Sequence, residues 1–336
     1  MKANLLRAFR IPLLAGSVVL ISDRPLFGKQ NTDATEQHEA EALVRYLQSK
    51  FLGGIPLLGN QFAPDPEDPI ALLFRYRNIL GLYFDGKYVE AEQESRTLMR
   101  IQRRQLGREH PDTLRSRAWL GVSLLGQLKY AEAETEFHGL LASRVRVLGA
   151  EHRDTLESRN NLAVALGHQG KLAEAETEHR AVLAIKERVL GAEHPDTLAS
   201  RNNLAVALCD QEKYAEAERM HREVLAIRKR VLGAEHPDTY RSQWALAEAF
   251  QGQGKNRETE ALYKETIPCM GRVLGAEHPD VLTCCYNLAD CLETQGKKDE
   301  ALKFARRALE GRRKLLGDKH PDTVEALELV ERLEKE

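Results

Sequence analysis

The chain repeats itself with a period of 42 residues. A pentad with the sequence Glu-His-Pro-Asp-Thr, or a close variant of it, recurs with that spacing along 336 residues. A fixed period of this length is typical of a solenoid, because one repeat cannot bury its apolar face alone and must stack on its neighbours. Such stacks present an extended surface, so the period favours binding over catalysis. The histidines of the six pentads are His110, His152, His194, His236, His278 and His320.

Each repeat predicts two antiparallel helices. In the repeat 155–196, an amphipathic pattern follows Asp154, which predicts a helix capped at that aspartate and ending near Gly170. A second helix is predicted over 172–190, with Gly191 as its left-handed stop. Small residues recur where the two helices must approach closely. They are Ala163, Ala205, Ala247 and Ala289 on the first helix and Ala91, Ala133, Ala175, Ala217 and Ala301 on the second.

Three motifs carry a resemblance to a known family. They are Asn-Asn-Leu-Ala at 160–163 and 202–205, an Ala-Glu-Ala-Glu start to the second helix, and a Leu-Gly-x-Glu-His-Pro-Asp closure. Together they resemble the tetratricopeptide repeat, in the 42-residue form found in kinesin light chains and many bacterial relatives. The resemblance runs from near Leu72 to the end of the chain. It implies an all-α fold, a right-handed α-solenoid of antiparallel helix pairs, that acts as a non-catalytic scaffold for protein binding.

The period also predicts the domain organisation. Residues 72–322 are expected to form the solenoid, and residues 323–336 a C-terminal capping helix. Residues 23–71 predict a helix and a loop that cap the other end. The expected boundaries of the repeats are 72–112, 113–154, 155–196, 197–238, 239–280 and 281–322.

The first 22 residues have the build of a signal peptide or other leader. Lys2, Arg7 and Arg10 precede the apolar run 11–21, which Pro12 interrupts. This run is shorter than the about 20 residues that a stable membrane span needs. Five cysteines without framework spacing favour a reduced compartment. Export and a cytoplasmic location therefore both remain open.

Charge and motif spacing argue against several classes of function. The 49 basic and 51 acidic residues nearly balance, which argues against a nucleic-acid partner. The trio His194, Asp196 and Ser200 recurs in other repeats, whereas an active site is needed once, so we expect no catalytic residues and no enzyme. Equivalent histidines lie roughly 16 to 20 Å apart across two helix spacings, too far for one metal ion. We expect no metal and no cofactor. An enzyme with its site in 23–71 is the weakest alternative.

The resemblance implies where a partner would bind. In the family, the first helix of each repeat lines a concave groove, and asparagine amides there hold the backbone of a bound peptide. An amide both donates and accepts, which suits an extended chain with unpaired groups. The alternative is that these amides pair with neighbouring side chains between repeats. The implied groove residues are Trp119, Asn160, Asn161, Asn202, Asn203, Trp244, Glu248, Tyr286, Asn287 and Asp290.

The groove residues change character along the chain. Valines stand beside the asparagines in the earlier repeats, whereas Trp244 and Tyr286 stand near Glu248, Asp290 and Glu293 in the later ones. Aromatic faces beside carboxylates attract cations. We therefore expect a protein or peptide partner that is apolar at one end and basic at the other. The alternative is a structural protein that self-associates or docks in a larger complex, and the oligomeric state stays open between the two.

Overall fold

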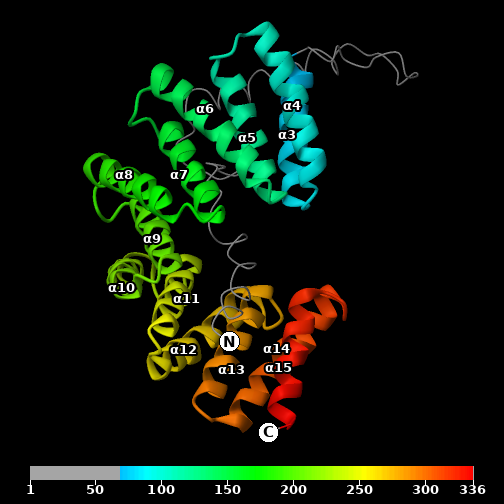
Figure 1. The fold of residues 1–336 in the computed structure, drawn as a ribbon, viewed down its shortest axis with the longest axis vertical. Coiled ribbons are helices and arrows are strands. Elements are labelled where there is room, and N and C mark those ends of the chain that lie inside the picture. Colours follow the sequence, from blue (N-terminus) through cyan, green and yellow to red (C-terminus); the bar gives the residue numbers. More distant parts are fainter. Residues whose placement is uncertain (1–68, 336) are drawn as a thin grey trace, which may run out of the picture. The chain divides into compact units, whose positions relative to one another are not determined.

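The computed structural model describes residues 69–335, which form thirteen helices and no strands (Figure 1). The leader at 1–22 and the cap predicted in 23–71, apart from its last three residues, lie outside this range. The helices are α3 (Pro69–Phe84), α4 (Tyr88–Gln105), α5 (Pro111–Gly126), α6 (Tyr130–Leu148), α7 (Arg153–His168), α8 (Leu172–Leu190), α9 (Pro195–Asp210), α10 (Tyr214–Leu232), α11 (Pro237–Gly252), α12 (Asn256–Leu274), α13 (Pro279–Thr294), α14 (Lys298–Leu316) and α15 (Pro321–Lys335).

The described residues form two compact units, an N-terminal unit (69–165) and a C-terminal unit (166–335). We call the odd-numbered helices A helices and the even-numbered ones B helices. In the C-terminal unit each helix from α8 to α15 packs on the next one in sequence, and the A helices α9 and α11 also touch. The N-terminal unit shows the same pairing, for example of α3 with α4 and of α4 with α5. The fold is therefore an all-α solenoid of helix pairs.

The residues of the pentad explain how the A helices from α5 onward begin. At α9 the N-cap is His194, whose Nδ1 accepts the backbone N–H of Asp196 at 3.1 Å, and Pro195 occupies the first helical position. Proline suits that position because its φ is already helical and its missing N–H would have no partner there. The prediction of a cap at Asp154 is wrong by two residues. In that repeat His152 Nδ1 accepts the N–H of Asp154 at 3.2 Å, and α7 starts at Arg153.

The B helices end where the glycines predict, but in a different backbone conformation. Helix α8 spans Leu172–Leu190 as predicted, and Gly191 follows it with φ 91° and ψ 161°. The prediction of a left-handed helical stop is wrong, since such a residue has ψ near 47°. The observed pair of angles belongs to a region that essentially only glycine occupies. Glycine is needed here more strictly than at an ordinary left-handed cap.

The small residues predicted at the helix contacts are buried. Each of them is at most 1% exposed, so the helices of a pair approach closely at these points, as the sequence predicts. A larger side chain at any of them would need the helices to move apart. The residues are Ala91, Ala133, Ala163, Ala175, Ala205, Ala217, Ala247, Ala289 and Ala301.

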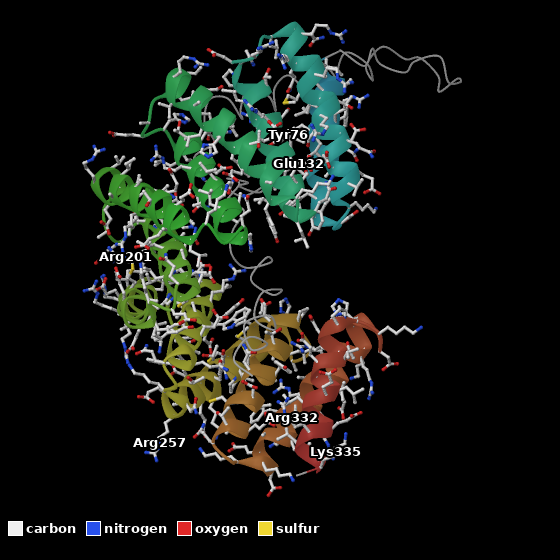
Figure 2. The ribbon with its side chains drawn as sticks, in the orientation of Figure 1. Tyr76, Glu132, Arg201, Arg257, Arg332 and Lys335 are labelled. Atoms are coloured by element: carbon white, nitrogen blue, oxygen red, sulfur yellow. The ribbon has the colours of Figure 1, made fainter. Side chains whose placement is uncertain are left out.

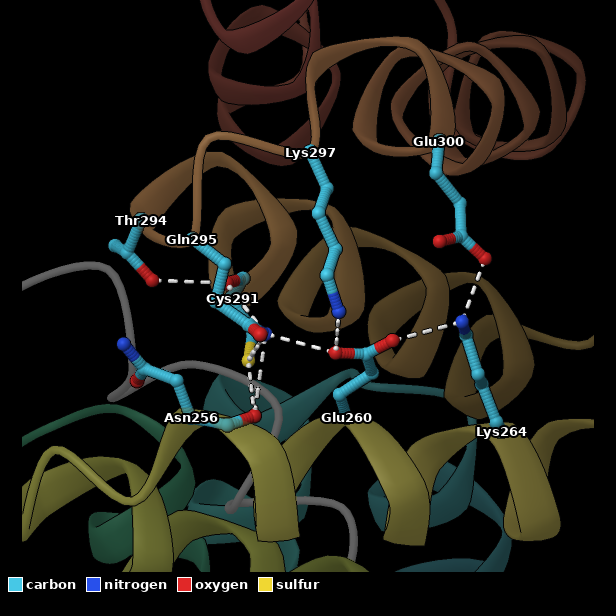
Figure 3. A network of polar contacts seen from close by, with 8 residues as sticks. All are labelled: Asn256, Glu260, Lys264, Cys291, Thr294, Gln295, Lys297 and Glu300. Carbon is cyan, nitrogen blue, oxygen red and sulfur yellow. Dashed lines mark hydrogen bonds and ion pairs between the residues drawn. The ribbon is translucent and has the colours of Figure 1, made fainter.

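A recurring polar cluster links four of the B helices, α4, α8, α10 and α12, to the hairpin that follows each of them. Figure 3 shows one copy, in which Glu260 of α12 accepts hydrogen bonds from Gln295 Nε2 at 3.0 Å and Lys297 Nζ at 2.5 Å. Lys264 Nζ donates to the other oxygen at 2.8 Å. These donors hold the pKa of Glu260 at about 2, so its carboxylate stays ionised. The same arrangement is found at Glu92, Glu176 and Glu218.

Candidate functional site

The A helices of the C-terminal unit place two rows of predicted groove residues on a partly exposed face. The helical period puts residues four apart on the same side of each helix, one turn from each other. Most other side chains of these helices are buried between neighbouring helices. The first row is Asn202, Trp244 and Tyr286, and the second, one turn later, is Val206, Glu248 and Asp290; all six are partly exposed.

Glu248 on α11 is a weaker acid than an ordinary carboxyl group. Burial raises its pKa to about 8, and the negative charge of Asp210 on α9 adds to the effect. At neutral pH most of this carboxyl is therefore protonated. A cation placed beside it would favour the ionised form and draw the proton off. The Glu248 carboxyl is therefore suited to become negatively charged when a positively charged group binds beside it.

Asp290 on α13 lies in a similar environment. Its Oδ2 accepts a hydrogen bond from Gln251 Nε2 at 3.1 Å. Burial raises the pKa of Asp290, and the neighbouring Glu293 raises it further. The charge of Glu293 itself is balanced, since Arg332 Nε and Nη2 donate to its two oxygens at 2.7 and 2.6 Å (Figure 2 labels Arg332 on α15). Glu293 is therefore already paired, and Glu248 and Asp290 are the carboxyl groups of this face that a cation of a partner could meet.

The two aromatic residues of the face differ in what covers them. The guanidinium carbon of Arg312 lies 4.8 Å from the centroid of the Tyr286 ring, so one face of that ring already holds a cation. No such stacking is found on Trp244 among residues 69–335. Trp244 is therefore the aromatic surface on which a cation of a partner could lie.

Four of the five predicted asparagines, all but Asn202, are buried in the packing between helices. Asn160, Asn161, Asn203 and Asn287 are between 1% and 6% exposed. Asn287 Nδ2 donates to the hydroxyl of Tyr263 on α12 at 3.3 Å. This contact corresponds to the alternative in which the amides pair between repeats. These amides therefore expose little surface to a bound peptide.

The N-terminal unit buries Trp119 as well as Asn160. Trp119 is 1% exposed, and its indole N–H donates to the hydroxyl of Tyr76 at 3.0 Å, with the two rings edge to face (Figure 2 labels Tyr76). Asn160 is 2% exposed. The predicted residues that remain accessible to a ligand are therefore Asn202, Trp244, Glu248, Tyr286 and Asp290.

Sequence reasoning missed two residues that shape the acidic face, Asp210 and Arg332. Asp210 stands where the other repeats have Gly126, His168, Gly252 and Thr294, so this position has no consensus and the period gave no signal for it. Arg332 lies beyond the last complete repeat, on α15. It stands one period after Asp290, in the same row as Glu248 and Asp290, so extending that row by 42 residues could have found it.

The recurring His-Asp-Ser trio has a structural use. The Nδ1 of His194 is engaged by the Asp196 backbone, and Ser200 Oγ donates to the Asp196 carbonyl oxygen at 3.0 Å rather than to the histidine. In the part of the chain that the structure describes, no three His, Cys, Asp or Glu side chains gather as a metal site would require. None of the helices in 69–335 is both long and apolar enough to span a membrane.

Comparison with known proteins identifies the repeats. Models of the tetratricopeptide repeat match residues 113–154, 155–196, 197–238 and 240–314, together more than half of the chain. A comparison with curated protein sequences gave no match.

Solved structures agree with the repeat matches. One similar structure is a kinesin light chain of Podosopora anserina with nearly identical TPR-like repeats: 28% identity, TM-score 0.54, 62% of this chain and 98% of that one. BtubC (BKLC) of P. vanneervenii is 18% identical over 74% of this chain and 94% of its own, with a TM-score of 0.55. NprR in complex with its cognate peptide NprX is 12% identical over 89% of this chain and 81% of its own, with a TM-score of 0.57. The chain belongs to the tetratricopeptide repeat family, in its kinesin-light-chain-like form.

Proposed function

We propose that the chain is a non-catalytic scaffold that binds an extended peptide on the A helices of its C-terminal unit. The observation that carries the proposal is the partly exposed Trp244 one helical turn from Glu248, a carboxyl whose pKa is raised to about 8 by burial and by Asp210. A lysine or arginine of the peptide would lie on the indole face and beside Glu248 and Asp290. Apolar side chains of the peptide would lie toward Val206 on α9.

The family supports this reading in general terms. Its helix pairs typically serve protein interactions, and both models that match the chain are of this repeat. NprR, which shares the fold, binds the peptide NprX. At 12% identity the likeness concerns the fold alone, so the choice of a basic peptide depends on Trp244, Glu248 and Asp290 of this chain.

Fluorescence anisotropy with a labelled peptide tests the proposal. The probe carries a Val-Leu-Val half and an Arg-Lys-Arg half and is prepared in both orders. Trp244→Ala should weaken binding by about 2 kcal/mol, or about 30-fold, if the indole is an anchor. Glu248→Lys should weaken it as strongly, because it places a like charge beside the peptide's cation.

Glu310→Lys on the exposed side of α14 makes the same charge change away from the face and should leave binding unchanged. The proposal fails if the two face variants bind the probe as well as the wild type does. If in addition sedimentation shows an oligomer that grows with protein concentration, the assembly function replaces it.

A further inference from the structure

A second surface of the C-terminal unit lies on its B helices. Helices α12 and α14 enclose a cleft of about 360 Å³, a size within the range of ligand sites. Its apolar lining is Ile267 and Pro268 of α12 and Phe304 of α14. Its cationic lining is Lys264, Lys303 and Arg307. The cleft thus combines an apolar wall with basic side chains and has no acidic residue in its lining.

The residues that form the cleft depart from the repeat. Pro268 lies inside α12, where the preceding B helices have Ala184 and Ala226. A proline within a helix has no N–H to donate and costs about 3 kcal/mol or more there. Phe304 of α14 stands where α12 has Leu262 and α10 has Met220. A costly residue and an enlarged aromatic side chain therefore meet at one pair of helices.

The cations of the cleft are not all neutralised by the protein. Lys264 forms ion pairs with Glu260 at 2.8 Å and Glu300 at 2.6 Å (Figure 3). Arg307 donates to the backbone oxygen of Ala276 at 3.3 Å. Neither Arg307 nor Lys303 has a carboxylate within ion-pair distance in the described part of the chain. The charges of Lys303 and Arg307 are therefore not neutralised, and both residues line the cleft beside its apolar wall.

We propose that this cleft binds an acidic peptide segment that carries an apolar side chain. A leucine or phenylalanine of the segment enters between Pro268 and Phe304, and aspartate or glutamate residues on either side of it meet Lys303 and Arg307. The charge of the cleft selects this partner, because a basic segment would be repelled there. The site is separate from the A-helix face and takes a peptide of opposite charge.

The test uses the whole chain and a fluorescein-labelled peptide of sequence Asp-Glu-Leu-Phe-Asp-Glu. The wild type should bind it saturably, and more weakly as salt is raised. Lys303→Glu and Phe304→Ala should each weaken binding at least about tenfold, whereas Phe304→Leu, which keeps an apolar wall, should bind nearly as the wild type does. Lys319→Glu is the matched control, since Lys319 lies in the exposed turn before α15 and outside the cleft.

Several results would overturn the proposal. They are the absence of saturable binding, equal binding of the neutral peptide Asn-Gln-Leu-Phe-Asn-Gln, and an equal loss in Lys319→Glu. A wild type that sediments as a dimer and becomes monomeric in Phe304→Ala would show that a second copy of the chain covers the cleft instead. Trp244→Ala should not change the binding of this acidic probe, so failure here is distinct from failure of the proposed basic-peptide site.

Discussion

At the scale of single residues, the imidazole of His221 is a polar group whose surroundings do not satisfy its hydrogen-bonding capacity. It is fully buried, and within the described range neither ring nitrogen has a hydrogen-bond partner. In the next repeat Tyr263 occupies the same position, and its hydroxyl accepts from Asn287. The residue that corresponds to Asn287 in the repeat of His221 is Ala245. The repeat of His221 therefore has a polar ring at this position and no amide opposite it.

Restoring the pair should stabilise the protein. His221→Tyr combined with Ala245→Asn copies the contact of Tyr263 with Asn287 into the preceding repeat. We expect the free energy of unfolding in urea to rise by about 1 to 2 kcal/mol, since a buried polar group without a partner is costly. The two single variants complete a double-mutant cycle. If the double variant gains no more than the sum of the singles, the two side chains do not form the expected hydrogen bond.

Glu248 gives a second residue-scale prediction, for the pH dependence of stability. Its pKa is about 8 in the folded protein and near 4.5 in an unfolded chain. Between these values the folded state binds more protons than the unfolded state, so this group makes stability fall as pH rises from about 4.5 to 8.

Glu248→Gln should remove that loss. Urea unfolding at pH 5 and pH 8 is expected to show a smaller difference for the variant than for the wild type, with the gain at pH 8. Glu310→Gln, at an exposed position, should keep the wild-type difference. An unchanged pH profile in Glu248→Gln would mean that the carboxyl is not protonated in the folded protein.

The sequence could predict which positions face the same side of a helix, but not which of them stay accessible. Trp119 and Trp244 stand in neighbouring rows of the predicted groove, yet Trp119 is packed against Tyr76 while Trp244 is partly exposed. An asparagine amide serves a bound peptide and a neighbouring helix equally well. Only the positions of the surrounding side chains decide between the two roles for Asn203 and Asn287.

At the scale of helices and turns, the glycine that follows most of the A helices has a measurable role. Gly170 follows α7 with φ 79°, and Gly254 and Gly296 take similar values. Two repeats lack the glycine and hold Leu128 and Glu212 there, with φ of 62° and 59°. Positive φ costs a non-glycine residue roughly 1 to 2 kcal/mol. These two turns therefore store strain that the others avoid.

Glu212→Gly should relieve that strain. We expect thermal unfolding to show a gain of about 0.5 to 1 kcal/mol, because the entropy that glycine adds to the unfolded chain offsets part of the relief. Gly170→Ala is the converse change and should destabilise by a similar amount. A destabilised Glu212→Gly variant would mean that the Glu212 side chain contributes contacts worth more than the strain.

Helix boundaries show what the repeat could and could not predict. The end of α8 at Leu190 followed from the glycine after it, which recurs with the period. The start of the A helices did not follow from capping preferences, because histidine is not among the usual N-cap residues. The imidazole nitrogen takes the role of the usual carboxylate or hydroxyl oxygen, and it does so even at His152, which is followed by Arg153 instead of proline.

At the scale of the whole molecule, the period of 42 residues predicts the family and the helix pairs, and the features that break the period carry the candidate sites. Trp244, Glu248 and Asp290 replace the asparagines and valines of earlier repeats, and Pro268 replaces an alanine. A pattern common to all repeats describes the scaffold. Residues that occur in only one repeat form the surface that a partner would contact. Which side chains surround them follows from the structure and not from the period.

The same organisation predicts how damage spreads. Within the C-terminal unit, helices contact their neighbours in sequence and the next A helix, so a local break has few routes to distant repeats. Ala205 on α9 is fully buried at a close helix contact. Ala205→Trp should overpack it at a cost of about 1 to 3 kcal/mol. Hydrogen exchange should show lost protection in α8 to α11 and native protection in α13 to α15.

The matched control is Ala226→Trp, which adds the same ring at an exposed position of α10 and should change protection nowhere. A uniform loss of protection from α8 to α15 in Ala205→Trp would mean that the unit unfolds as one cooperative body. In that case the nearest-neighbour account of the solenoid would be wrong. If the loss is local, a substitution on the face around Trp244 can be tested for its own effect on binding. The condition is that it leaves the hydrogen-exchange protection of α12 and α14, which form the cleft, unchanged.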